Sequence, residues 1–236
     1  MKPGARRFWT DVAVAEEPDG FGVRLDGKPL MTPAGRRLAA PTRAAAEAVA
    51  QEWSAVEGAV RPEAMPYTRA VNVAIDRVAA AREAVAVQIA AYGESDLVCY
   101  RASDPEALRR RQAAAWDPVL AWAEDRLGAR LVPVEGILHH AQPQASLDAL
   151  RDAVGTEDAF ALTALHELAT LSGSLLLALA VRHGALPAEE AWTLARLDET
   201  WQAELWGEDA EAAEVAARRR EDFLRASRLL ELLATR

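Results

Sequence analysis

Histidine is a common zinc ligand, and two motifs in the 236-residue chain contain it. Neither motif has further ligands at the spacing that a zinc site requires. His166-Glu167 begins like the helix of a zinc protease, in which a second histidine follows four residues after the first. Thr170 occupies that position, so a helix histidine bonded to a neighbour is the better interpretation. The pair His139-His140 has no cysteine or carboxylate at ligand spacing and is interpreted as part of a loop. The sequence therefore predicts no metal site.

Candidate nucleophiles and phosphate-binding loops are equally sparse. Ser174 follows Gly173 inside an apolar helical segment, whereas a hydrolase nucleophile needs a sharp turn between a strand and a helix. Cys99 is the only cysteine and lies in a strand-like apolar run, where a free thiol acts as a small hydrophobic residue. Neither a Walker A loop nor a dinucleotide-binding fingerprint can be placed on the chain. We therefore expect no cofactor and no enzymatic activity.

The segment from residue 184 to 214 differs in charge and aromatic content from the rest of the chain. It carries nine acidic residues against one basic residue, Arg196, and so holds −8 of the formal net charge of −9. It also holds three of the seven tryptophans. A dense combination of aromatic and acidic side chains is typical of a surface that binds a partner, because aromatic anchors surrounded by charges dominate binding energy.

Helical periodicity divides the side chains of this segment between two faces. We expect one helix from residue 187 to about 207. One stripe of it is apolar and is interpreted as the core face: Leu194, Leu197, Trp201 and Leu205. A second face, roughly 90–160° away, carries Trp192, Glu199 and Trp206. This face indicates either a partner-binding surface or a contact with another helix that covers it.

Short apolar runs separated by turns predict an antiparallel sheet near the start of the chain. The expected strands are residues 8–15, 20–25 and 28–31, and Asp26-Gly27 is a two-residue hairpin signal. Helices are expected over 42–57 and 68–91, and a further strand over 96–100 is expected to return to the sheet. Together these elements predict a small N-terminal α/β domain over residues 1–103, with helices covering the sheet.

From residue 104 onward the pattern is almost wholly helical. The expected helices span residues 104–127, 146–155, 156–183, 187–207 and 209–234. The most apolar stretch, residues 168–181, is shorter than the roughly 20 residues that cross a bilayer, and is interpreted as a buried core helix. The expected fold class is α+β, in which the N-terminal domain precedes an all-helical C-terminal domain over residues 104–236.

The composition restricts the possible partners and compartment. The chain is 51% hydrophobic and 27% charged, which is typical of a globular protein and excludes a disordered one. Its net charge of −9 argues against nucleic-acid binding, because phosphate contacts require lysine and arginine. A single cysteine fits a reducing compartment, and the basic N-terminus lacks the apolar core of a secretory signal. We expect a soluble, cytoplasmic protein that does not insert into membranes.

Several motifs combine tryptophans, glycines and acidic residues at fixed offsets, from about residue 6 to 232. They are Arg7-Phe-Trp9, Leu25-Asp-Gly-Lys-Pro-Leu30, Thr32-Pro-Ala-Gly35, Glu52-Trp53, residues 66–76, Gly173-Ser-Leu-Leu-Leu-Ala-Leu-Ala180 and residues 194–212. In this combination the chain resembles the family of assembly chaperones of the ATP synthase alpha subunit, found in mitochondria and in alphaproteobacteria.

The resemblance implies a chaperone rather than an enzyme. Members of this family bind the free alpha subunit of the soluble head of the F-type ATP synthase and prevent its aggregation until the beta subunit replaces them. The resemblance also implies an N-terminal α/β domain, a helical C-terminal domain, and neither cofactor nor metal. We expect a bacterial, cytoplasmic member of the family, because no mitochondrial presequence precedes the first motif, whereas eukaryotic relatives act in the mitochondrial matrix. We also expect a monomer.

The acidic, tryptophan-containing segment is the expected client surface. Our hypothesis is that Glu199, Trp206, Glu204 and Asp209 form its core. The ring supplies contact area, while the carboxylates attract arginine and lysine side chains of the client. Trp53 is expected to be structural and to pack its helix on the sheet.

Two other classes of function remain as alternatives. The first is a cofactor-free enzyme that uses Asp198 and Glu199, although adjacent helix positions diverge by 100° and do not easily share a substrate. A deep pocket around a carboxylate with a raised pKa would favour it. The second is a module that binds a small molecule or a peptide. A closed cavity would favour a small ligand, and a broad, shallow acidic surface would favour a protein partner.

Overall fold

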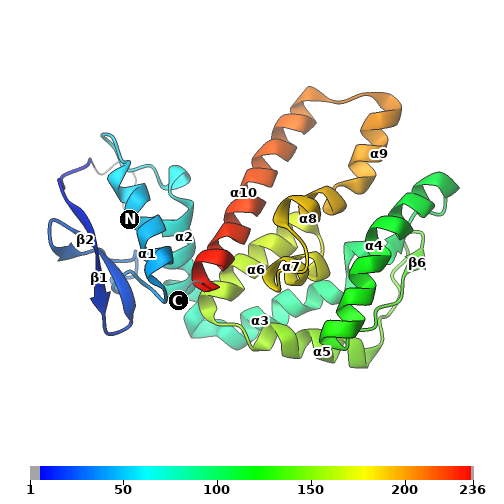
Figure 1. Ribbon diagram of the computed structural model, residues 1–236, viewed down its shortest axis with the longest axis horizontal. Helices are drawn as coiled ribbons and strands as arrows, with labels where there is room; N and C mark the ends of the chain where they lie inside the picture. Colours follow the sequence, from blue (N-terminus) through cyan, green and yellow to red (C-terminus); the bar gives the residue numbers. More distant parts are fainter. Residues whose placement is uncertain (1–5, 235–236) are drawn as a thin grey trace. The chain divides into compact units, whose positions relative to one another are not determined.

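The computed structural model describes residues 6–234, and their contacts divide them into two compact units (Figure 1). Unit 1 contains the chain up to Arg82, together with Asp158–Ala164 and the chain from Arg228 onward. Unit 2 contains Glu83–Glu157 and Leu165–Ser227. The expected domain limits of 1–103 and 104–236 stay a prediction.

Unit 1 contains the predicted antiparallel sheet. Its strands are β1 (Val12–Glu17), β2 (Gly20–Leu25), β3 (Lys28–Pro29) and β4 (Ala39–Ala40). β2 is central, because it pairs with each of the other three strands. The hairpin signal is confirmed: Asp26 and Gly27 both have positive φ, and the Asp26 carboxylate accepts hydrogen bonds from the backbone of Thr10 and Asp11, each 2.9 Å long. The sheet begins later than expected, because residues 8–11 do not pair as a strand.

Helices and short turns complete unit 1. They are α1 (Arg43–Ser54), a 3₁₀ turn (Pro62–Ala64), α2 (Pro66–Val73), a π-helical turn (Ala74–Val78) and a 3₁₀ turn (Ala79–Ala81). The Glu52 carboxylate of α1 accepts hydrogen bonds from the first free amides of α2, at Tyr67 and Thr68, over 2.7 and 2.8 Å. Trp9 and Trp53 lie in the core between sheet and helices, with ring centroids 5.0 Å apart.

Unit 2 is almost wholly helical, as the sequence predicts. Its elements are α3 (Arg82–Ala90), 3₁₀ turns (Ala91–Ser95 and Leu97–Cys99), β5 (Tyr100–Arg101), α4 (Glu106–Leu127), β6 (Val134–Glu135), α5 (Gln144–Gly155), α6 (Ala159–Ser172), α7 (Leu175–Arg182), α8 (Ala188–Ala195), α9 (Leu197–Trp206) and α10 (Ala210–Ala234). α6 and α10 each contribute residues to both units. The N-terminal sheet followed by helices confirms the α+β class.

One predicted element near the start of unit 2 is wrong, and a predicted helix before it is irregular. Residues 96–100 do not return to the N-terminal sheet: Leu97–Cys99 form a 3₁₀ turn, and Tyr100 pairs with Val134 in a separate parallel pair of strands. Asp96 causes the turn, because its carboxylate accepts a hydrogen bond from the Val98 amide. The helix expected over 68–91 is present as a continuous run of helical turns, in which residues 74–81 have π and 3₁₀ rather than α hydrogen bonding.

Two helices predicted as continuous are each broken in two. The helix over 156–183 is α6 and α7, which are separated at Gly173, where φ is +71°. Ser174 then caps α7 by accepting a hydrogen bond from the Leu177 amide. The helix over 187–207 is α8 and α9. They meet at Arg196, whose backbone has φ −109° and ψ 17° and so leaves the helical region.

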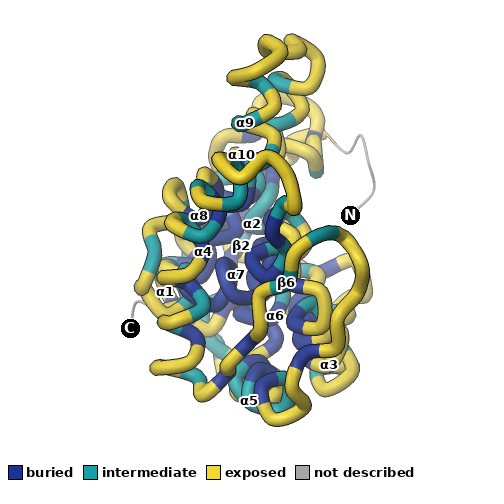
Figure 2. Tube along the Cα trace, turned by 90° about the vertical axis from the view of Figure 1, so that its right-hand side faces the viewer, coloured by how far each residue is buried: buried dark blue, intermediate teal, exposed yellow. Residues whose placement is uncertain are grey.

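The core of unit 2 surrounds α7. Its residues 175–180 are buried from every side, and Trp116 of α4 and Phe223 of α10 are buried as well. By contrast, the turn after α9 and the first residues of α10 are largely exposed (Figure 2). Leu197 is the buried residue of α9, so this helix has little hydrophobic contact with the core.

Candidate partner-binding surface

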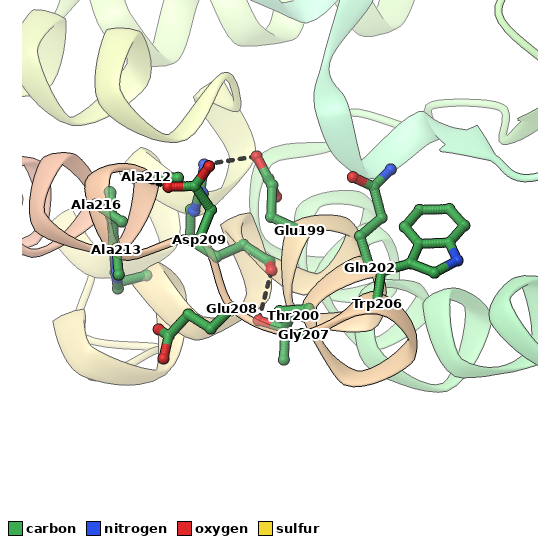
Figure 3. Close-up of a pocket in the computed structure, with 13 residues that line it drawn as sticks. Glu199, Thr200, Gln202, Trp206, Gly207, Glu208, Asp209, Ala212, Ala213 and Ala216 are labelled. Carbon is green, nitrogen blue, oxygen red and sulfur yellow. Dashed lines mark hydrogen bonds and ion pairs between the residues drawn. The ribbon is translucent and has the colours of Figure 1, made fainter.

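A hollow of about 460 Å³ lies between α9 and α10 (Figure 3). It is called the α9–α10 hollow below. Three of the four predicted site residues line it: Glu199, Trp206 and Asp209. The opposite wall is made of small side chains of α10, namely Ala212, Ala213 and Ala216. The hollow is therefore open enough for a partner's side chains and has an acidic edge.

Glu199 lies at the start of α9 and faces the α9–α10 hollow. Its carboxylate is paired with the Arg196 guanidinium over 2.5 Å, and both side chains are partly exposed. An exposed pair of this kind contributes little to stability, because water screens both charges. A basic side chain from a partner can therefore compete with Arg196 for this carboxylate at small cost.

Trp206 is the last residue of α9, and 79% of it is exposed. Its indole ring lies beside Gln202, one turn earlier on the helix (Figure 3). The adjacent Leu205 is 57% exposed, although the sequence assigned it to the core face. Such neighbouring apolar side chains on a helix end are suited to contact with another protein.

Asp209 has a structural role in addition to its charge. Its carboxylate accepts hydrogen bonds from the amides of Glu211 and Ala212, over 2.8 and 3.1 Å, at the start of α10. A carboxylate in this position satisfies amides that lack a partner within the helix. Asp209 therefore fixes the start of the helix that forms one wall of the α9–α10 hollow.

Glu204 lies outside the α9–α10 hollow and contacts α4. Both of its carboxylate oxygens accept hydrogen bonds from Arg111, over 2.6 and 2.9 Å. These hydrogen bonds hold the pKa of Glu204 below its usual range and raise the pKa of Arg111. The Arg111 guanidinium also lies 5.8 Å from the centroid of the Trp201 ring. The structure thus brings three of the predicted site residues together and places the fourth against another helix.

Trp192 does not lie on the open face with Glu199 and Trp206, contrary to the prediction from the sequence. This residue is only 7% exposed, and its ring packs on Phe223 of α10, with centroids 5.6 Å apart. The cause is the break at Arg196, because the angular relation between Trp192 and Trp206 was derived for one continuous helix. For Trp192 the alternative of a covering helix is correct.

The remaining candidates do not form a reaction centre within residues 6–234. His166, His139 and His140 are exposed, and no group of three or more possible metal ligands occurs in this part of the chain. Burial raises the pKa of the Cys99 thiol to about 12, so the reactive thiolate is disfavoured. Ser174 serves as a helix cap.

The adjacent carboxylates of Asp198 and Glu199 have different neighbours. Asp198 accepts a hydrogen bond from Gln112 of α4 over 2.7 Å, whereas Glu199 is paired with Arg196. The structure therefore does not bring them together on one substrate.

The contacts that two residues of α4 make with α9 could not be predicted from the sequence. Arg111 and Gln112 are separated from their partners in α9 by 93 and 86 positions, so neither spacing nor local composition predicts the contacts. Gln202 and Ala203 could have been found, because they follow Glu199 by three and four residues on the same helix face.

No helix within residues 6–234 is long and apolar enough to cross a membrane.

Comparison with known proteins identifies the family. A family model described as ATP12 chaperone protein matches residues 6–124. The mitochondrial protein atp12 of Schizosaccharomyces pombe is 25% identical over 226 residues, which cover 91% of this chain and 78% of that protein. The crystal structure of Atp12 from Paracoccus denitrificans has a TM-score of 0.94 and 46% identity, covering 97% of this chain and 98% of that one. The Atu1473 protein of Agrobacterium tumefaciens has a TM-score of 0.90 and 48% identity, with coverages of 97% and 85%. The chain therefore belongs to the ATP12 chaperone family.

Proposed function

We propose that the chain is an assembly chaperone of the F-type ATP synthase that binds the free alpha subunit of the soluble head. It keeps this subunit from aggregating until the beta subunit takes its place, and it acts as a monomer in the bacterial cytoplasm without catalysing a reaction. Membership of the ATP12 chaperone family supports the chaperone role. The main observation that supports the location of the client surface is the exposed Trp206 at the acidic α9–α10 hollow.

The chemistry of this surface fits a client that must later be released. A subunit that buries large interfaces in its final complex exposes apolar patches while it is alone, and such patches aggregate. The chaperone has to cover a patch and still yield to the final partner, which favours a modest, partly polar contact. One exposed ring with carboxylates around it provides this combination. The carboxylates speed the encounter with a basic surface, and the ring supplies the apolar contact.

We assign the client surface to Glu199, Trp206 and Asp209 at the hollow, whereas Glu204, bonded to Arg111 on the side of α9 that faces α4, supports this surface from behind. The first two lie seven residues apart, and therefore about 20° apart around the helix. Both are accessible in the isolated chain. Asp209 adds charge at the same hollow and fixes the start of α10.

The test is capture of purified alpha subunit by the immobilised chain. We expect the wild type to retain the alpha subunit, to suppress its light scattering on warming, and to release it when beta subunit is added. The double variant Glu199→Lys, Trp206→Ala should lose capture, because it removes the exposed ring and reverses one charge at the hollow. Its Tm should stay close to that of the wild type, because the Glu199 side chain is about half exposed and Trp206 is 79% exposed.

A matched control removes an exposed aromatic ring and reverses an exposed charge elsewhere. Phe8→Ala with Glu94→Lys does so outside the hollow. This control should capture the alpha subunit like the wild type. If the wild type and the Glu199, Trp206 variant capture equal amounts of alpha subunit, the proposed function stands, but the client surface must lie elsewhere on the chain. No capture by the wild type would reject the proposed client.

A further inference from the structure

Helix α9 presents two faces with different surroundings. Glu199 and Trp206 point to the α9–α10 hollow, whereas Glu204 lies about 140° around the helix from Glu199. The second face meets α4, and its contacts are polar: the Arg111–Glu204 pair and the hydrogen bond from Gln112 to Asp198. One face is therefore open, and the other is bonded to the body of unit 2.

The contacts with α4 matter because α9 has little else to hold it. Leu197, at its first turn, is the buried residue of the helix, and the helix ends at the exposed Trp206. A segment with few buried apolar contacts has low local stability. Near the end of α9, Arg111 provides a two-pronged hydrogen bond to Glu204 and stacks near the Trp201 ring. Bidentate pairing of this type fixes direction as well as distance.

We infer that Arg111 is a positioning residue, which holds α9 through Glu204 so that the face with Glu199, Gln202 and Trp206 is presented to the client. This inference rests on the proposed function. The client region that meets the open face carries basic side chains, because the hollow is lined by three carboxylates, those of Glu199, Glu208 and Asp209, and by one guanidinium. Glu204 therefore affects binding from the far side of α9 and does not itself contact the client.

Exchanging the charges of Arg111 and Glu204 distinguishes a positioning role from direct contact of Glu204 with the client. The variants are Glu204→Arg, Arg111→Glu, and the pair that carries both changes. We expect each single variant to bind the alpha subunit about tenfold more weakly, because like charges then face each other across α4 and α9. The double variant again places opposite charges at positions 111 and 204, with their signs exchanged. It should bind the alpha subunit within about twofold of the wild type. Tm should change little, since an exposed ion pair contributes little to unfolding free energy.

A second measurement does not depend on the client. Hydrogen exchange of the α9 amides, residues 197–206, should be faster in each single variant and return to the wild-type rate in the pair. This measurement tests the inference separately from the proposed function. If the wild type fails to bind the alpha subunit, the proposed function is rejected. The exchange rates then still show whether Arg111 holds α9.

The matched control is Glu199→Arg, alone and with Arg111→Glu. Both forms should bind weakly, because Glu199 lies on the open face and has no contact with α4 that the second change could repair. The inference is overturned if the exchanged pair binds as weakly as Glu204→Arg, since Glu204 would then touch the client. It is also overturned if α9 exchange is the same in all variants. If a reversed charge prevents folding, Arg111→Gln and Glu204→Gln replace the single variants; each removes the ion pair and should speed hydrogen exchange of α9, and the inference is overturned if neither does.

Discussion

At the scale of single residues, the tryptophans of this chain divide into structural and exposed ones. Trp53 is 5% exposed and packs its ring against Trp9, and the Trp9 indole donates a hydrogen bond to the carbonyl oxygen of Trp53. Trp206 is 79% exposed at the end of a helix. The same side chain thus stabilises the fold in one place and is free for a partner in the other.

The first prediction compares these two tryptophans. Trp53→Ala should lower the free energy of unfolding by about 3–5 kcal/mol, because it leaves a cavity between α1 and the sheet. Trp206→Ala serves as the matched control and should leave the free energy of unfolding within about 0.5 kcal/mol of the wild type. Urea denaturation followed by circular dichroism measures both. An unchanged midpoint for Trp53→Ala would show that Trp53 is not structural.

The sequence predicts part of the site at this scale. Glu199 and Trp206 lie on one face because their seven-residue spacing is within a single helix, α9. Trp192 lies in a different helix, so the same reasoning fails for it. Arg111 could not be predicted at all, because its contact with Glu204 depends on how α4 packs, which local sequence does not encode.

At the scale of elements, the helix breaks show where local signals are sufficient. The surrounding apolar run predicts one helix, but Gly173 and Ser174 are residue types that favour a break. Gly173 has a positive φ, and Ser174 caps α7. Arg196 carries no such signal, because arginine is a good helix former. The break there depends on tertiary contacts of α8 and α9, among them the hydrogen bond from Trp116 to the Leu194 carbonyl oxygen.

Asp96 connects the first of these breaks to a distant part of unit 2. Its carboxylate is fully buried and accepts hydrogen bonds from the amides of Val98 and Leu176, so it caps the 3₁₀ turn and α7 together. Burial raises the pKa of Asp96 to about 6, although the hydrogen bonds, including one with the Ser174 side chain, act in the opposite direction. The folded state therefore penalises the charged form relative to the unfolded chain, although the carboxylate is still mostly ionised at pH 7.

This shift predicts a specific pH dependence of stability. The folded-state pKa of Asp96 is about 6, above its model value of 3.8, so the folded protein binds more protons than the unfolded one between these values. The contribution of Asp96 to the free energy of unfolding is fully present below about pH 4 and is lost as pH rises through 6. The loss is on the order of 3 kcal/mol.

Asp96→Asn tests this assignment. The amide keeps one hydrogen-bond acceptor and does not titrate, so the difference in unfolding free energy between variant and wild type should shift in favour of the variant from pH 4.5 to pH 7.5. Taking this difference cancels the effects of other titrating groups. Urea denaturation at both values measures it, and a difference that is independent of pH would contradict the raised pKa.

At the scale of the whole molecule, the class of fold follows from the order of sequence patterns. Alternating apolar residues and turn signals come first, and helical periods fill the remainder, as the structure confirms. The exception, residues 96–100, illustrates the limit: a short apolar run suits a strand or a buried turn equally, and the Asp96 hydrogen bonds decide between them. That α6 and α10 each contribute residues to both units depends on tertiary contacts, which local sequence does not encode.

The uneven charge of the molecule is relevant to its encounter with a client. Residues 184–214 hold −8 of the net charge of −9, and the structure places them on α8, α9 and the start of α10, with Glu199, Glu208 and Asp209 at the α9–α10 hollow. Acidic charge concentrated at one surface attracts a basic surface before contact is made, and salt weakens this attraction.

The last prediction follows from this distribution of charge. The association rate with the alpha subunit should fall by about tenfold when NaCl is raised from 50 to 500 mM, as stopped-flow measurements can show. Glu208→Gln with Glu211→Gln removes two charges near the hollow and should reduce this dependence on salt. Glu83→Gln with Glu94→Gln removes two exposed charges outside the acidic segment and should leave it nearly unchanged. Equal salt dependence in the two variants would mean that the total charge of the molecule, rather than the acidic segment, governs the encounter.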